Sequence, residues 1–507
     1  MEKENEVSLE QEQSTKKQSC FLRMLGFDTV GKQTTVRTEI IAGIVTFLAM
    51  AYILTVNPNV IAGDMAELWP SLFIATALGA IIGTLLMAFF AKMPLAQASG
   101  MGLNSLLGGL IATGAITSYG GQFTVGQAFM LVLLSGILFL VLSVVKIKGK
   151  TFRELVFDGM PVAVRSAISV GIGLFIAFIG FQNAKIIGDD PILLVGLVNF
   201  SKYNFNVATA CVCFIGLFLI AVLDKLNVKG SVILGIFGAT IIGIPLGVTD
   251  LSMLAGKGGV SWKFWENFAN FFVGGNTVFG SFTDVFTKGL VPANVTIFTV
   301  IMIIITMCMM DMFDTMGTIV GCCGGNRVLS DENNKPHNYG KIMLADSIAT
   351  CAGAMIGTST VSTFVESGAG VSAGGRTGLT AFTVAVMFFL SMFAMPLFAT
   401  IPDAATASAL IYVGVLMMKN NVKDIDFSNA INATSAFLTI SVMVLSYSIT
   451  KGIGVGMVAY TLMSVLSYFV EIVKYAITKK NKPVWNVSLV AVIVSILFCV
   501  YFFVPTV

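Results

Sequence analysis

Residues 357–378 read GTSTVSTFVESGAGVSAGGRTG, and this stretch decides how the rest of the chain folds. It contains six glycines, eight serines or threonines and one carboxylate, Glu366, between long apolar runs. Each glycine costs a helix about 1 kcal/mol relative to alanine, so a continuous helix is disfavoured. In a bilayer, unwound backbone persists only where protein buries it or where it lines a polar cavity, as in the binding sites of secondary transporters. Since an ionisable residue at membrane depth indicates function, we predict half of a substrate site around Glu366.

A second pair of carboxylates lies in another apolar segment. Residues 301–318 read IMIIITMCMMDMFDTMGT. Asp311 and Asp314 are three residues apart, so their side chains share one face of a helix. Either carboxylate could instead mark the aqueous end of a spanning helix, and this alternative applies more readily to Asp311 than to Asp314. We therefore predict that Asp314 supplies the other half of the site.

The composition is that of a membrane protein with many spans. Of 507 residues, 56% are hydrophobic and 11% are charged, and the mean hydropathy is +0.88. The net charge of +3 is dispersed, so no basic face for nucleic acid is expected. The eight cysteines form no CxxC pair, and the single histidine, His337, lies in a polar stretch. We expect no enzyme, no catalytic residue, no metal site and no cofactor.

The apolar segments predict two sets of seven spans, each about the 20 residues that a bilayer requires except where glycines interrupt them. Lysine and arginine are enriched in every second loop, which places the N-terminus in the cytoplasm of a multi-pass cell-membrane protein. The expected units are a cytoplasmic tail with an interfacial segment (1–38), spans in 39–145 and 161–247, an extracellular loop (248–291), spans in 292–400 and 402–475, and an extra apolar segment (486–505).

The two sets repeat each other. Residues 99–105 read SGMGLNS in the third span of the first set, and residues 367–373 read SGAGVSA in the third span of the second. Because seven is odd, the second copy must enter the membrane in the opposite orientation, as in the inverted repeats of transporters. The predicted fold is an all-α polytopic membrane protein of about 14 spans in a 7+7 inverted repeat, with half-helices or short strands at spans 3 and 10.

Four ordered stretches carry a family resemblance: residues 36–58 (VRTEIIAGIVTFLAMAYILTVNP), 100–104 (GMGLN), 312–321 (MFDTMGTIVG) and 362–381 (STFVESGAGVSAGGRTGLTA). They resemble the AzgA-like purine permeases, the guanine/hypoxanthine/adenine branch of the xanthine/uracil permease family. The resemblance implies a core domain (39–145 and 292–400) and a gate domain (161–247 and 402–475) in an elevator-type symporter. It also implies proton-coupled purine uptake and a homodimer formed through the gate.

The resemblance also implies site residues. The acidic substrate residue of the eighth span falls on Asp314, and its partner on the tenth span falls on Glu366. The third-span glycine and asparagine fall on Gly102 and Asn104. The family usually has an alanine and two aromatic residues after this asparagine, whereas here residues 105–107 read SLL. An aromatic wall that could stack on a base is therefore missing from this span.

The expected binding chemistry centres on Glu366. An ionised carboxylate accepts hydrogen bonds from base N–H and amino groups, and such charge-assisted bonds are the stronger ones. Backbone N–H groups at Ser367–Gly370 and at Gly100–Gly102 are expected to meet the acceptors of the base at the facing half-helix ends. The amide of Asn104 offers both a donor and an acceptor. Candidates for stacking on the base, each of which ordinary packing explains more readily, are Phe313, Phe364 and Tyr52.

Asp314 is the preferred proton carrier, with Glu366 and Asp311 as further candidates, because intramembrane carboxylates form the proton relays of transporters. A carrier of another nucleobase, a carrier of a small anion on the same fold and a non-transporting membrane sensor remain alternatives. Two carboxylates would repel an anion, which disfavours the second alternative. The sequence leaves open which purine is carried, whether Na⁺ replaces H⁺, and whether residues 486–505 cross the membrane.

Overall fold

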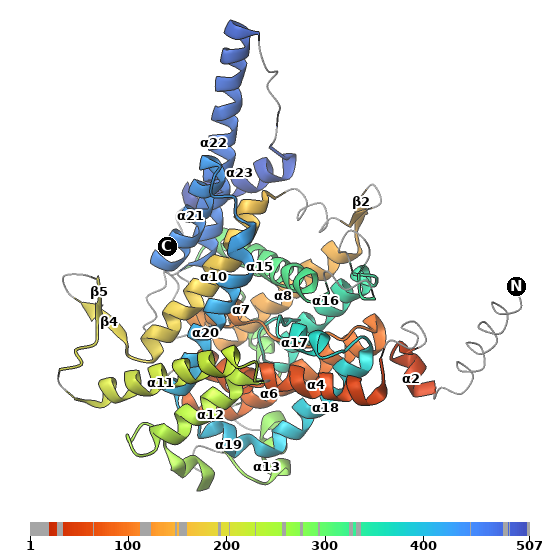
Figure 1. Ribbon diagram of the computed structural model, residues 1–507, viewed down its shortest axis with the longest axis vertical. Coiled ribbons are helices and arrows are strands. Elements are labelled where there is room, and N and C mark those ends of the chain that lie inside the picture. The colour runs from red at the N-terminus through yellow and green to blue at the C-terminus, as the bar shows by residue number, and fades with distance from the viewer. Residues whose placement is uncertain are drawn as a thin grey trace, which may run out of the picture.

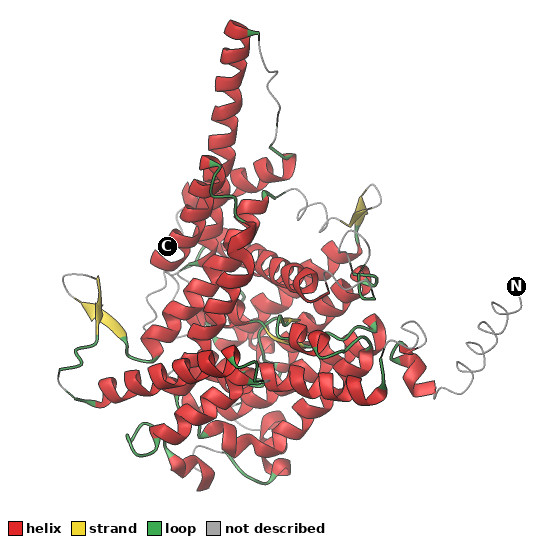
Figure 2. Cartoon of the chain, viewed as in Figure 1, coloured by secondary structure: helices red, strands yellow, loops and turns green. Residues whose placement is uncertain are grey.

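The computed structural model describes the chain in these ranges: 20–27, 34–63, 65–111, 123–147, 150–151, 160–190, 194–201, 203–228, 230–255, 260–273, 277–292, 295–323, 328–330, 336–446, 448–479, 485 and 487–503. Helices make up most of the described residues, and the strands are few and short (Figure 2). Seven helical stretches in these ranges are long and apolar enough to cross a membrane, and five shorter apolar helices accompany them. The chain is therefore a multi-pass membrane protein.

The helices of the first half are α2 (Cys20–Met24), α4 (Val36–Met50), α5 (Ile53–Ala62), η2 (Ala66–Leu68), α6 (Trp69–Leu86), the π-helix η3 (Met87–Ala91), α7 (Met101–Ile111), α8 (Val125–Val144), α10 (Val162–Asn183), α11 (Phe205–Lys225) and α12 (Ser231–Gly243). The connecting stretch contains η4 (Leu251–Ala255), α13 (Phe264–Val273), η6 (Ser281–Asp284) and α14 (Val285–Lys288).

The helices of the second half are α15 (Ile297–Cys323), α16 (Tyr339–Ile356), α17 (Ser367–Ser372), α18 (Gly378–Ser391), η7 (Met392–Ala394), α19 (Met395–Ala399), α20 (Asp403–Asn421), η8 (Val422–Asp424), α21 (Ala430–Leu445), α22 (Ile449–Thr478) and α23 (Leu489–Phe503). Two hairpins lie outside the bundle: β2 (Lys146–Ile147) pairs with β3 (Lys150–Thr151), and β4 (Ile187–Asp190) pairs with β5 (Leu194–Leu197).

Two short strands interrupt the third and the tenth spans. β1 (Gln97–Ser99) precedes α7, β6 (Val361–Thr363) precedes α17, and the two strands pair antiparallel with Gln97 opposite Thr363 and Ser99 opposite Val361. All six strand residues are buried. The paired strands satisfy each other's backbone groups, which an unwound segment inside a membrane protein requires. The prediction of broken spans with short strands is confirmed.

The helices pack in two groups, each with members from both halves of the chain. The strand-bearing group consists of α4 to α8, α15 to α18, β1 and β6, and the all-helical group consists of α10 to α12 and α20 to α22. The groups meet where α4 contacts α12, α5 contacts α20 and α7 contacts α10. In Figure 1, α7 and α17 lie near the middle of the molecule, between α4 and α10.

The first span is also broken, which the sequence analysis did not predict. Its helix begins at Val36, before the predicted boundary at residue 39, because the Thr35 side chain accepts a hydrogen bond from the Thr38 N–H and caps α4. The helix is then interrupted at Ala51 and Tyr52 before α5 begins. This interruption places Tyr52 opposite α17.

The last apolar segment packs against its predecessor. α23 folds back along α22, where the Ser495 hydroxyl donates to the Met457 carbonyl at 3.0 Å and lies 2.7 Å from the Thr461 hydroxyl. Farther along the pair, Tyr468 contacts Trp485 edge-to-face. Figure 1 shows the remainder of α22 projecting from the bundle.

Candidate functional site

The candidate site forms where the two interrupted spans cross. The Gly100 N–H donates to the Thr360 carbonyl at 2.9 Å, and the Phe364 N–H donates to the Ala96 carbonyl at 3.0 Å, so the pairing extends beyond both ends of the strand ladder. Ser367 adds a third link, since its hydroxyl accepts from the Ala96 N–H at 3.0 Å. These bonds fix the start of α7 relative to the start of α17.

Glu366 ends the segment between β6 and α17, in the N-cap position of α17, but its side chain does not cap that helix. Instead, the Tyr52 hydroxyl donates to Glu366 Oε1 at 2.6 Å. Tyr52 is 1% exposed, whereas Glu366 is half-buried. The break in the first span therefore holds a tyrosine that orients the carboxylate of the tenth span, rather than a ring that is free to stack.

Asp314 lies on α15 and is also half-buried. Its Oδ2 accepts a hydrogen bond from the hydroxyl of Ser362, the central residue of β6, at 3.3 Å. Asp314 and Glu366 lie close enough for their charges to interact. The structure thus brings the two predicted carboxylates together at β6.

The other predicted residues surround the crossing. Asn104 is 1% exposed; its Oδ1 accepts from the Ser359 hydroxyl, and its Nδ2 donates to the Ser99 carbonyl at 3.5 Å. Gly102 faces α10, because an added Cβ would lie 3.0 Å from Ile172 Cγ2. Gly368 lies beside Glu366 in less crowded surroundings, where an added Cβ would find Cys322 Sγ at 3.6 Å.

The backbone groups near Glu366 differ from expectation. The N–H groups of Ser367, Gly368 and Ala369 donate to the carbonyls of Phe364, Val365 and Glu366, at 2.9 to 3.1 Å. A tight turn therefore uses these donors, and the expectation that they meet the base at this point is wrong. Of the stacking candidates, Phe364 is 6% exposed and belongs to the core, and the side chain of Phe313 lies outside the described part of the structure.

A buried polar network behind β6 includes one predicted residue and one that the sequence analysis missed. Asp311 is 1% exposed, and its Oδ2 accepts from the Thr350 hydroxyl at 2.9 Å. Asp346, on α16, is fully buried and accepts from Gln97 Nε2 at 2.8 Å, Thr315 Oγ1 at 2.7 Å and Thr363 Oγ1 at 3.3 Å. Since Gln97 and Thr363 are opposite each other in the strand pair, Asp346 fastens both strands to α15 and α16.

A cavity of about 420 Å³ opens beside Glu366, within the size range of small-molecule sites. The strand-bearing group contributes Glu366 and Gly368 to its wall, and the all-helical group contributes Asp224, Ser231 and Tyr412. Asp314 and Asn104 are not among the residues that line it. Among the described residues, no three His, Cys, Asp or Glu side chains gather as metal ligands.

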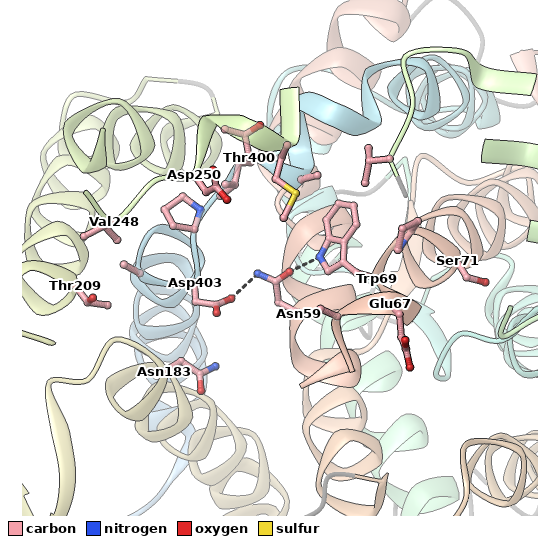
Figure 3. Close-up of a pocket in the computed structure, with 18 of the residues that line it drawn as sticks. Asn59, Glu67, Trp69, Ser71, Asn183, Thr209, Val248, Asp250, Thr400 and Asp403 are labelled. Atoms are coloured by element: carbon pink, nitrogen blue, oxygen red, sulfur yellow. Dashed lines mark hydrogen bonds between the residues drawn. The ribbon is translucent and has the colours of Figure 1, made fainter. Parts of the chain in front are cut away.

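A larger cavity, of about 860 Å³, lies at the opposite end of α11 and α20. A hydrogen-bonded chain crosses it: Trp69 Nε1 donates to Asn59 Oδ1 at 2.5 Å, and Asn59 Nδ2 donates to Asp403 Oδ1 at 2.8 Å (Figure 3). Asn59 and Trp69 belong to the strand-bearing group, and Asp403 begins α20 of the all-helical group. This chain therefore links the two groups at the end remote from Glu366.

The broken spans and the paired carboxylates are typical of a transporter of the inverted-repeat class. Residues 37–455 match the Permease family Xan_ur_permease, and the chain belongs to this family. It is 37% identical over 434 residues to the guanine/hypoxanthine permease PbuO of Bacillus subtilis (strain 168), covering 85% of this chain and 92% of that one. It is 32% identical over 446 residues to the adenine permease AdeP of Escherichia coli (strain K12), covering 85% and 88%.

Solved structures share the fold at low sequence identity. The transmembrane domain of the cyanobacterial bicarbonate transporter BicA aligns with a TM-score of 0.57 at 16% identity, over 83% of this chain and 97% of that domain. SLC26A9 aligns with a TM-score of 0.52 at 12% identity, over 88% and 68%. These likenesses, with the strand crossing, establish the 7+7 inverted-repeat fold.

Proposed function

We propose that this protein imports purine nucleobases by proton-coupled secondary transport and that Glu366 binds the base. The observation that carries the proposal is the position of Glu366, a half-buried carboxylate at the end of an interrupted span and at the wall of a cavity. A cavity whose wall contains the carboxylates of Glu366 and Asp224 suits a ligand with several N–H donors and no negative charge. The names of the relatives, guanine/hypoxanthine and adenine permeases, support the same class of ligand.

Binding follows from the contacts of Glu366. Tyr52 occupies Oε1 and fixes the plane of the carboxylate, so that Oε2 accepts from a ring N–H or an amino group of the base. Gly368 lies at the cavity wall next to this carboxylate and leaves room for the base. Asn104, Gly102 and Ser367 act mainly by holding the crossing in shape, since their described contacts are with the scaffold.

The proton is carried by the carboxylates at β6. Asp314 is not among the residues that line the cavity, and it accepts from Ser362, so it can gain or lose a proton without losing its position. Asp314 contacts β6 through Ser362 and Glu366 follows the same strand, so a proton on Asp314 is taken up next to the segment that holds the base-binding group. Asp311 lies deeper, in contact with Thr350, and is the less favoured carrier.

Transport requires the two groups to move relative to each other. We assign the strand-bearing group to the core domain and the all-helical group to the gate domain. The cavity at Glu366 opens beside Lys225 and the loop after α11, which the charge distribution places in the cytoplasm together with the N-terminus. The conformation described here is then open to the inside, and the bond between Asn59 and Asp403 closes core against gate on the outside.

The protein acts in the lipid bilayer as a homodimer, and the all-helical group forms the interface between the two copies. The proton gradient is the energy source for uptake. No cofactor or enzymatic activity is expected.

Uptake into proteoliposomes tests this function. Purified protein is reconstituted, and entry of radiolabelled guanine, hypoxanthine, adenine, uracil and bicarbonate is compared with and without an inward proton gradient. We expect gradient-stimulated uptake of at least one purine and none of bicarbonate. Bicarbonate is the second candidate because of the fold that BicA shares, and its uptake without purine uptake would contradict the proposal.

A further inference from the structure

The wall of the cavity at Glu366 contains one aromatic side chain among its described residues, Tyr412. This tyrosine lies on α20, in the all-helical group, and faces the same space as Glu366 from the other side of the boundary between the groups. The remaining wall is aliphatic, small or polar, and its larger apolar members are Val45, Val228, Val232, Val365 and Leu416.

The position of Tyr412 is set at its backbone by helix packing and at its hydroxyl by the neighbouring Asp224. Its backbone lies in a tightly packed part of α20, where an added Cβ on the neighbouring Gly414 would lie 2.4 Å from the Gly173 carbonyl of α10. Tyr412 is 7% exposed, and its hydroxyl lies next to the carboxylate of Asp224 at the end of α11. Asp224 also lines the cavity. A ring fixed in this way can present a surface to a ligand with little loss of side-chain freedom on binding.

The third span lacks aromatic residues after Asn104, where Ser105, Leu106 and Leu107 follow. A planar heterocycle that binds Glu366 through its N–H edge still has two faces to cover. Stacking of a nucleobase on an aromatic side chain contributes about 1–3 kcal/mol per base, and it depends on the ring rather than on any one hydrogen bond.

We propose that Tyr412 supplies the aromatic surface for the bound base and that Asp224 is the positioning residue that orients its ring. This inference rests on the proposed function and adds a specificity determinant from the all-helical group. The base is then recognised by both groups at once, at its edge by Glu366 and at its face by Tyr412. A ligand without an extended aromatic face would contact Glu366 but cover little of Tyr412. The arrangement therefore favours bicyclic purines over smaller rings.

The test is the concentration dependence of hypoxanthine, guanine and adenine uptake in proteoliposomes. Tyr412→Leu keeps most of the side-chain volume but removes the ring, and Tyr412→Phe keeps the ring but removes the hydroxyl that lies next to Asp224. Val415→Ala, on the exposed side of the same helix and outside the cavity wall, is the matched control. Asp224→Asn, alone and combined with Tyr412→Phe, tests the positioning role.

We expect Tyr412→Leu to raise the KM for the transported purine roughly tenfold or more, with the maximal rate changed less than threefold. Tyr412→Phe and Asp224→Asn should each raise KM about two- to fivefold, and the double variant no further, because both remove the same contact. Val415→Ala should leave KM within about twofold of the wild type.

An unchanged KM in Tyr412→Leu, or an equal effect of Val415→Ala, would overturn the inference while leaving purine transport intact. Absence of purine uptake in the wild type would overturn the inference together with the proposed function. Monodispersity and thermal stability of each detergent-solubilised variant are measured in parallel. If Tyr412→Leu does not fold, Tyr412→Trp replaces it, because tryptophan keeps an aromatic surface. The stacking role predicts a KM within about threefold of the wild type in Tyr412→Trp, and a larger rise in KM contradicts it.

Discussion

The hydroxyl of Tyr52 donates a hydrogen bond to Glu366 Oε1 at 2.6 Å, across 314 residues of sequence. This bond joins the break in the first span to the break in the tenth. It sets the direction in which the Glu366 carboxylate faces the cavity, so the central binding group depends on a residue that carries no charge itself.

Removal of that hydroxyl should weaken substrate binding. A hydrogen bond to a charged group contributes about 1.5–3 kcal/mol, so Tyr52→Phe should raise the KM for purine uptake roughly tenfold or more. Tyr468→Phe, whose ring contacts Trp485 far from the site, is the matched control and should behave as the wild type. Equal kinetics in Tyr52→Phe and the wild type would show that Glu366 does not need this partner.

Asp314→Asn separates binding from coupling. The amide oxygen can still accept the hydrogen bond from Ser362, but the side chain no longer exchanges a proton at physiological pH. We expect exchange of internal for external purine to continue at a rate within about threefold of the wild type, while gradient-driven accumulation is lost. Full accumulation in this variant would exclude Asp314 as the proton carrier.

Asp311→Asn is the companion to that experiment, because Asp311 lies three residues earlier on the same helix and contacts Thr350. We expect it to retain proton-driven accumulation, although its buried position predicts a lower thermal stability of the protein. Loss of accumulation in Asp311→Asn with normal behaviour of Asp314→Asn would reverse the assignment.

The bond between Asn59 and Asp403 should control opening on the outside. Asn59→Asp keeps the acceptor for Trp69 but places two carboxylates side by side, and their repulsion favours separation of the two groups. We expect faster labelling of a cysteine introduced at Thr400, which lines the cavity of Figure 3, by a membrane-impermeant maleimide.

The double variant Asn59→Asp/Asp403→Asn exchanges donor and acceptor, so labelling at residue 400 should return towards the wild-type rate. Asp250→Asn, which changes a charge in the same cavity outside the bridge, is the control. If the single and double variants label equally fast, the bridge does not hold the groups together.

Gly102 and Gly368 form a matched pair for testing the space around the site. A Cβ at Gly102 would crowd Ile172 at 3.0 Å where the two groups meet, whereas a Cβ at Gly368 would find its nearest neighbour at 3.6 Å. Overpacking costs about 1–3 kcal/mol, so Gly102→Ala should lower the maximal uptake rate roughly fivefold or more. Gly368→Ala should change the maximal rate by less than about twofold and act on the KM instead, because Gly368 leaves room for the base at the cavity wall. The reverse order would show that the α7–α10 contact does not limit transport.

Much of the fold could be predicted because the relevant signals are local. Glycines and serines within apolar runs indicated both broken spans. The similarity of residues 99–105 to residues 367–373 indicated that the two spans are related by the internal repeat. The pairing of β1 with β6 follows from the need of unwound backbone for partners.

The partners of the site residues could not be predicted in the same way. The contact of Tyr52 with Glu366 and the bridge from Asn59 to Asp403 depend on how distant helices pack, which no local pattern encodes. The donors after Glu366 were misjudged because a tight turn uses them. Asp346 could have been found as a lone acid within the apolar run LADSIATCAG, residues 344–353.

The most direct test of the central claim is purine uptake by Glu366→Gln, measured beside the wild type at matched amounts of folded protein in proteoliposomes. Glutamine keeps the size of the side chain and can still accept from Tyr52, but it removes the negative charge. We predict that saturable uptake of guanine, hypoxanthine and adenine is lost, with a decrease of roughly 100-fold or more in the ratio of maximal rate to KM. Uptake by Glu366→Gln with the KM and maximal rate of the wild type would contradict the assignment of Glu366 as the group that binds the base.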